Sequence, residues 1–132
     1  MYAVRWSCVA SGLPPCGEAE AQDILALAAS TFEAMDQPDA LMELDIRFHE
    51  AIARASGNPL YAIIVSSFRV ITRQTWHIGW RSRATFENRL ENIRCHERIA
   101  KAIAAQTPAE ADAAIIEHFD SAVSVLLRAS IT

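Results

Sequence analysis

The sequence has few of the features that mark secreted or membrane proteins. Its 132 residues include three cysteines, and these are scattered and odd in number. A disulfide framework is therefore not expected, and a reduced, cytoplasmic setting fits the composition better. Apolar runs such as 24–29 and 61–65 are far shorter than the roughly 20 residues that cross a bilayer, so no transmembrane helix and no membrane partner are predicted.

Positive charge is also scarce. The chain carries 12 lysines and arginines against 16 acidic residues, which gives a net charge of -4 and an isoelectric point near 5.5. A nucleic-acid-binding surface normally needs a basic patch, and the sequence shows none. Direct contact with DNA by this chain alone is therefore not expected.

Common catalytic motifs are missing as well. The sequence contains no nucleophile elbow, no glycine-rich phosphate loop and no HExxH pair. No spare inward-facing carboxylate stands out as a general base. We therefore predict that the protein is not an enzyme.

The sequence does contain a helical pattern over most of its length. Hydrophobic residues make up 52% and charged residues 21% of the chain, which is typical of one globular domain. Apolar residues recur every three to four positions, and no segment alternates as a strand would. The pattern predicts an all-α antiparallel helical bundle of about five to six helices over 18–132, after an irregular N-terminal arm over 1–17. The expected helices span 18–35, 39–55, 59–78, 85–105 and 107–129.

Several helix ends are marked by local signals. Gly57 is expected to adopt the left-handed conformation that ends a helix, and Asn58 to cap the next one. Thr107 and Glu110 have the spacing of a capping box. The 59–78 helix is apolar on more than one side and is predicted to lie at the centre of the bundle.

Three predicted helices carry polar residues on faces that otherwise point inward. Asp45 and His49 lie one turn apart on the 39–55 helix, among leucine, isoleucine and phenylalanine. A buried carboxylate or imidazole needs a partner, because an unpaired buried charge costs several kcal/mol. His96 and His118 face inward on two other helices, whereas His77 shows no partner and is interpreted as a surface or interface residue. A lone inward histidine is usually a hydrogen-bonded core residue, but one aspartate and three histidines together form a metal site by ligand type.

The order of these residues resembles the FCD effector-binding domain. This is the C-terminal, ligand-sensing domain of FadR-type regulators in the GntR family of bacterial transcription factors. The similarity covers about 18–127. It rests on three segments: Leu44-Asp45-x-x-Phe48-His49-x-x-Ile52-Ala53-x-x-Ser56-Gly57-Asn58-Pro59, His96-x-x-Ile99-x-x-Ala102-Ile103, and Ala111 leading to His118.

The resemblance implies a set of functional properties. Asp45, His49, His96 and His118 become ligands of a divalent ion such as zinc, nickel or manganese. In metal-containing members the ion is completed by water or by the carboxylate of a small organic acid, so a small carboxylate effector is expected. The resemblance also implies homodimers and transcriptional control.

The sequence departs from the family pattern in two respects, one of which is that the first helix of the sensor domain is expected to be missing or replaced by the arm over 1–17. Regulators of this family carry an N-terminal winged helix-turn-helix domain, and this sequence shows no such domain. We expect either a piece of a longer regulator or a protein without the DNA-reading half, and DNA contact through that domain only in full-length relatives.

The ligand set allows more than one use of the metal. Three nitrogens and one oxygen can close a tetrahedral structural zinc site, or fill part of a six-coordinate sphere that leaves room for a carboxylate. Small alanines around His118 favour the open form. A metal-dependent enzyme of unknown reaction and a purely structural metal-binding dimerisation bundle remain as alternatives.

An organic acid also needs a cation or a hydrogen-bond donor beside the metal. Arginine offers a planar fork that matches a carboxylate. We expect Arg69 first and Asn92 second to contact the effector, with Arg73 and Arg89 as further candidates. Surface arginines whose stems cover apolar area are the alternative for each.

Overall fold

The computed structural model describes residues 16–130, and these residues form six helices without a strand. The predicted all-α bundle is therefore confirmed. Of the predicted arm over 1–17, residues 1–15 lie outside the described residues. The helices are α1 (Glu18–Glu33), α2 (Pro38–Ala55), α3 (Pro59–Ser67), α4 (Arg69–Ser82), α5 (Phe86–Ala104) and α6 (Pro108–Ser130).

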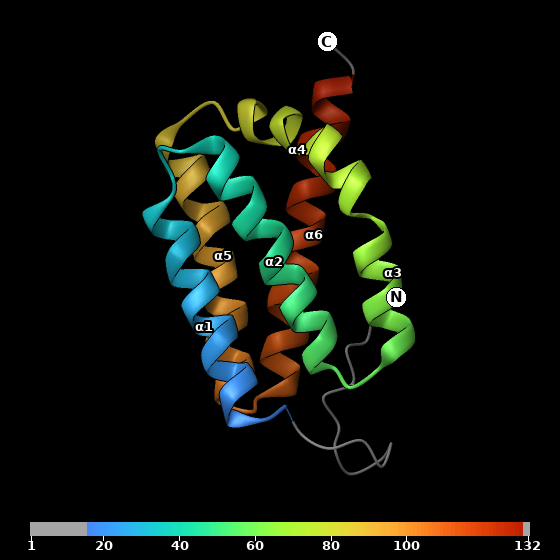
Figure 1. Cartoon of the computed structure of the whole chain (residues 1–132). Coiled ribbons are helices and arrows are strands. Elements are labelled where there is room, and N and C mark those ends of the chain that lie inside the picture. Colours follow the sequence, from blue (N-terminus) through green and yellow to red (C-terminus); the bar gives the residue numbers. More distant parts are fainter. Residues whose placement is uncertain (1–15, 131–132) are drawn as a thin grey trace.

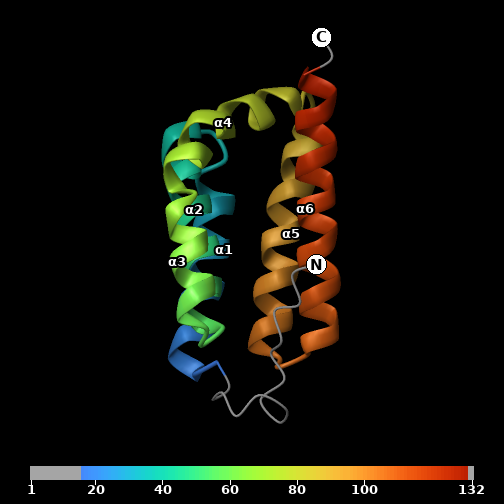
Figure 2. The ribbon, with the colours of Figure 1, turned by 90° about the vertical axis from the view of Figure 1, so that its right-hand side faces the viewer.

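The long helices run side by side, and one helix crosses their end. α1 packs against α2 and α5, and α5 packs against α6. α3 lies beside α2, and α4 passes over one end of the bundle from the α2–α3 side to α6 (Figure 1). The view turned by 90° shows α3 and α6 on opposite sides of the molecule, joined by α4 (Figure 2). α4 therefore connects the two sides of the bundle.

The core lies between α1, α2, α5 and α6. Burial of apolar side chains is the main favourable term in folding, and these four helices contribute almost all of it. Among the largest fully buried side chains are Phe48, Ile24, Leu41 and Ile99. His96 is also among them, with 1% of its surface exposed. An imidazole thus lies at the same depth as the aliphatic core.

The predicted helix ends agree with the structure. Gly57 has a φ of 68°, in the left-handed region that favours glycine. The Asn58 side chain accepts hydrogen bonds from the backbone N–H groups of Leu60 and Tyr61, at 3.0 and 3.3 Å. α6 begins at Pro108 as expected, but the predicted capping box is not formed, because the Thr107 backbone N–H donates to the carbonyl of Ala102 and Thr107 Oγ1 lies 3.2 Å from Glu110 Oε2.

The prediction of one central helix over 59–78 is wrong. The chain breaks at Phe68, where Ser67 Oγ bonds back to the carbonyl of Ile64 and competes with the helical pattern. α3 has no buried residue, and Leu60 and Ile63 are 64% and 65% exposed. Some apolar side chains of this segment line a cavity, and others are exposed to solvent. Helical periodicity does not distinguish such a position from a buried one.

No helix within residues 16–130 combines the length and apolar character needed to cross a bilayer.

Candidate metal centre and cavity

α2 carries the first two residues of the site. Asp45 and His49 are separated by one helical turn, so both side chains leave the same face of α2. His49 Nε2 lies 3.3 Å from Asp45 Oδ1. The two side chains are 15% and 26% exposed, Asp45 being the more buried. They therefore stand at the boundary between the core and a solvent-reachable space.

α5 and α6 bring two more histidines to the same point. His96 Nε2 lies 3.1 Å from Asp45 Oδ1, and His118 Nε2 lies 3.2 Å from His49 Nε2. One ligand atom from each of the four residues falls within 4.8 Å of every other. We call these four residues the Asp/His cluster. The structure thus brings together all four residues that the sequence singled out as metal ligands.

The spacing in the Asp/His cluster fits a shared divalent ion. Two ligand atoms at about 2.0–2.1 Å from a zinc ion are about 3.4 Å apart at a tetrahedral angle and about 2.9 Å apart at a right angle. The three distances given above lie between these limits. Asp45 Oδ1 and His96 Nε2 are close, but they are not aligned as a hydrogen bond. A short distance without a hydrogen bond is expected when the lone pairs of the oxygen and of the nitrogen both point toward a metal ion.

Trp76 of α4 holds the other oxygen of the carboxylate. Its Nε1 donates a hydrogen bond of 2.7 Å to Asp45 Oδ2, which leaves Oδ1 for the histidines. Trp76 also stacks on Trp80, with ring centroids 5.3 Å apart. The hydrogen bond from Trp76 to Asp45 was not predicted from the sequence. Trp76 and Asp45 are 31 positions apart, and no local sequence pattern predicts a contact over that separation.

The rings of His96 and His118 are oriented by packing. Their Nδ1 atoms are buried without a hydrogen-bond partner among residues 16–130. The Phe48 ring lies 4.7 Å from the His96 ring, and the Phe119 ring lies 5.6 Å from the His118 ring, measured between centroids. Aromatic neighbours therefore set the direction of both imidazoles.

The charge states of Asp45 and His118 suit a cation. Burial raises the pKa of the Asp45 carboxyl, but the electrostatic interaction with the adjacent His96 and His49 outweighs burial and holds that pKa well below its usual range. Burial lowers the pKa of His118 well below that of a free histidine, and the neighbouring His96 and His49 lower it further. At neutral pH the aspartate is charged and His118 is neutral. These are the forms that bind metal.

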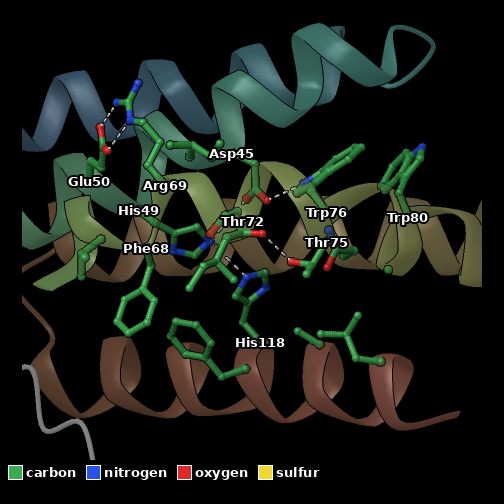
Figure 3. Close-up of a pocket in the computed structure, with 18 of the residues that line it drawn as sticks. Asp45, His49, Glu50, Phe68, Arg69, Thr72, Thr75, Trp76, Trp80 and His118 are labelled. Atoms are coloured by element: carbon green, nitrogen blue, oxygen red, sulfur yellow. Dashed lines mark hydrogen bonds and ion pairs between the residues drawn. The ribbon is translucent and has the colours of Figure 1, made fainter. Parts of the chain in front are cut away.

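A cavity of about 480 Å³ adjoins the Asp/His cluster, and we call it the main cavity. Its wall includes Asp45, His49 and His118, whereas His96 lies behind that wall. Figure 3 shows the first three side chains converging between α2 and α6, with Thr72, Thr75 and Trp76 of α4 beside them. An ion held by the cluster would therefore face protein on one side and open space on the other.

The four predicted effector contacts fall into two groups. Arg69 and Asn92 line the main cavity, but the Arg69 guanidinium is engaged by both oxygens of the buried Glu50 carboxylate. Arg73 forms the same kind of two-bond contact with Glu43, at 2.7 and 2.8 Å, outside the cavity lining. Arg89 also lies outside the lining. Its Nε donates to the carbonyl of Arg83, and its guanidinium lies 5.2 Å from the Trp80 ring.

Arg83, which the sequence did not single out, lines the main cavity. It lies just after α4, and its Nη2 donates a hydrogen bond of 3.2 Å to Ser121 Oγ of α6. Burial lowers its pKa, while the negative charge of Asp45 acts in the opposite direction. Arg83 therefore places a positive charge in the cavity wall, close enough to Asp45 and His118 to interact with both electrostatically.

His77 has a partner that the sequence did not show. Its Nε2 lies 3.3 Å from Asp39 Oδ1, and its side chain is 36% exposed. The interpretation of His77 as a surface residue agrees with this position. His77 is not part of the Asp/His cluster.

A second cluster of potential metal ligands is occupied by an arginine side chain. Glu91, Cys95 and Glu117 lie close together on α5 and α6. Arg98 contacts all three, at 2.9 Å to Glu91, 2.8 Å to Cys95 Sγ and 3.3 Å to Glu117. A guanidinium in this position supplies the positive charge that an ion would bring.

Comparison with protein families matches residues 8–121 to the FCD domain. The match begins inside the range predicted as an arm and includes all four residues of the Asp/His cluster. No curated protein and no solved structure matches the chain.

Proposed function

The chain belongs to the FCD domain family, and on that premise we propose that it binds a divalent metal ion and, through it, a small carboxylate effector. As an FCD domain, it is an effector-sensing domain of the GntR type. Asp45, His49, His96 and His118 would hold the ion. When bound, the ion would act as a Lewis acid that attracts the oxygens of a carboxylate.

One observation carries this proposal. Three members of the Asp/His cluster line the main cavity, and the fourth is buried behind them. A closed structural site needs no such space, whereas a sensor needs room for its effector next to the ion. The volume of about 480 Å³ lies in the range of small-molecule sites. This arrangement favours the open form of the site.

The donor set narrows the choice of metal. Imidazole nitrogens suit zinc, nickel and other late first-row ions, and the single carboxylate also accepts manganese. We propose zinc, nickel or manganese as the ion. The buried Phe48 ring packs on His96 and the Phe119 ring lies beside His118, which supports a preformed site.

We also propose that the protein works as a homodimer in transcriptional control, as its family implies. An exposed apolar stripe on α6 supports an interface, because large apolar patches on a protein surface usually meet a partner. Its members recur every three to four residues and are 44–60% exposed: Ile116, Phe119, Val123 and Leu127. Effector binding would then act by shifting the arrangement of helices or subunits.

The experiment that tests the proposal combines elemental analysis with a thermal-shift assay. We expect one divalent ion per purified chain, or per chain after reconstitution with zinc chloride. Acetate, citrate and octanoate would then be tested as probes. A bound carboxylate at one hundred times its Kd adds about 2.7 kcal/mol to stability, and removing the ion with EDTA should abolish that gain.

Three outcomes of this experiment separate the alternatives. Stabilisation by the ion and by at least one carboxylate supports the sensor. Stabilisation by the ion alone would support a purely structural metal bundle. A chain that neither contains nor takes up an ion would contradict the metal site itself.

Trp76→Phe tests the hydrogen bond that orients the Asp45 carboxylate. The substitution keeps an aromatic ring but removes the Nε1–H donor to Asp45 Oδ2. Because such partners of a ligand commonly contribute 10- to 100-fold to metal affinity, we expect zinc binding to weaken by about that factor. Trp80→Phe is the matched control, since Trp80 stacks on Trp76 one turn away. Equal zinc affinities in the two variants would contradict the role of Trp76.

A further inference from the structure

Most of the wall of the main cavity outside the Asp/His cluster is apolar. α3, α4 and α6 supply aliphatic and aromatic side chains to the lining. Figure 3 shows Thr72 and Thr75 beside Asp45 and His118, with Phe68 farther along the cavity. Besides these hydroxyls, the polar part of the lining includes the Arg69–Glu50 ion pair and Asn92. The apolar lining includes Ile64, Val65, Phe68, Ile71, Phe119, Val125 and Leu126.

Within the described lining, the positively charged groups that can bind an anion are two arginines, Arg69 and Arg83. Arg69 donates through Nε and Nη2 to the two oxygens of Glu50, and Glu50 is only 7% exposed. The ion pair as a whole carries no net charge, because the Glu50 carboxylate balances the positive charge of the Arg69 guanidinium. Arg83 donates to the neutral hydroxyl of Ser121 and keeps its charge for an anion. The cavity thus offers one arginine without an acidic partner, Arg83, whereas Arg69, next to Phe68, is paired with Glu50.

The apolar space continues past the histidines. A smaller cavity of about 40 Å³ shares His49, Tyr61, Val65, His118 and Phe119 with the main cavity. Its remaining walls are the side chains of three isoleucines from α2, α5 and α6, Ile52, Ile99 and Ile115. The region between α3 and α6 is therefore lined by hydrocarbon on several sides.

We infer that the effector is a monocarboxylate with an apolar body, an alkyl or aryl-alkyl acid whose carboxylate binds between the ion and Arg83. Its hydrocarbon part lies against Val65, Phe68 and Phe119 of the main cavity. The inference rests on the proposed function, because the carboxylate needs the ion. It adds the chemical class of the effector.

Desolvation explains why this class is preferred. A second carboxylate or a row of hydroxyls at the Phe68 end would lose water without gaining a free cation, which costs several kcal/mol. A hydrocarbon chain gains from the same walls, and each buried CH₂ tightens binding by about fourfold. Dicarboxylates and sugar acids are therefore expected to bind less tightly than alkyl acids of similar size.

A chain-length series on the zinc-loaded protein tests the inference. Isothermal titration calorimetry would compare acetate, butanoate, hexanoate, octanoate and 3-phenylpropanoate with succinate, citrate and gluconate. We expect the Kd to fall about fourfold per added CH₂ until the cavity is full, and succinate and gluconate to bind more weakly than hexanoate. Comparison of the alkyl acids with 3-phenylpropanoate shows whether the cavity prefers an alkyl chain or an aromatic ring. 1-Octanol is the control for binding without a carboxylate and should bind far more weakly than octanoate.

A pair of variants on α3 tests where the hydrocarbon lies. Val65 lines the main cavity and is half-buried, whereas Ile63 is 65% exposed on the same helix and does not line it. Val65→Asn should weaken octanoate binding by about tenfold or more while leaving acetate binding and zinc content unchanged. Ile63→Asn should leave all three unchanged. Equal octanoate affinities in the two variants would overturn the placement.

The possible failures are distinguishable. If zinc binds and citrate, succinate or gluconate binds more tightly than every alkyl acid, the inference is overturned and the proposed function stands. If an ion binds but no carboxylate does, or if none of zinc, nickel and manganese binds, the proposed function fails and the inference fails with it. The series on the unmodified protein gives this answer even if Val65→Asn does not fold.

Discussion

His96→Ala is expected to abolish metal binding, with a loss of zinc affinity of more than about 100-fold. Groups that merely orient a ligand contribute 10- to 100-fold, and a ligand itself should exceed them. His96 is 1% exposed, and its Nε2 lies 3.1 Å from Asp45 Oδ1. Removal of the His96 imidazole leaves the Asp45 carboxylate with fewer polar partners in the core. Carboxylate binding should be lost together with the ion, since the effector is proposed to bind through it.

Competition with a chromophoric chelator would measure the zinc affinity, and elemental analysis would measure the zinc content. His77→Ala is the matched control, because His77 contacts Asp39 outside the Asp/His cluster. It should keep full zinc affinity. His96→Gln retains most of the side-chain volume and so separates metal loss from a packing defect. A His96 variant with unchanged zinc affinity would remove this residue from the site.

Phe48→Ala should lower the free energy of unfolding by about 3–5 kcal/mol. Its side chain is fully buried on α2, and its ring lies 4.7 Å from the His96 ring and 5.4 Å from the His49 ring. The substitution removes a large apolar group and leaves a cavity in the core. Since small domains are stable by only about 5–15 kcal/mol, this is a large fraction of the total.

Urea unfolding of the metal-free protein would give this difference without a contribution from the ion. Phe32→Ala is the matched control, because Phe32 is 57% exposed on α1. Its effect should stay within about 0.5 kcal/mol, as is usual for a surface substitution. Similar losses for the two phenylalanines would contradict the core position of Phe48. With zinc present, Phe48→Ala should also weaken metal binding, because the ring that orients His96 is gone.

Features that depend on neighbours in the chain could be predicted from the sequence. The left-handed conformation of Gly57 and the cap by Asn58 depend on backbone conformation and short-range hydrogen bonds. The pairing of Asp45 with His49 follows from one helical turn. The family assignment was predicted from the order of the same residues, and the match over 8–121 confirms it.

Features that depend on packing between helices could not be predicted in the same way. The inward faces of His96 and His118 were visible in the pattern, but their meeting with Asp45 and His49 depends on how α5 and α6 pack. The helix break at Phe68 was also not predicted, because the periodic spacing of apolar residues continues through this position.

Pairing between distant side chains decided the rest of the site. Arg69 is a reasonable carboxylate ligand by sequence, yet in the fold its guanidinium meets Glu50, 19 positions away. Trp76 reaches Asp45 from α4 over a separation of 31 positions. Local chemistry thus determined which side chains are able to bind a metal or an anion, because a helix sets the direction of each side chain. Only the tertiary structure decided which of them keep free ligand atoms, because charges and hydrogen-bond donors are paired across helices.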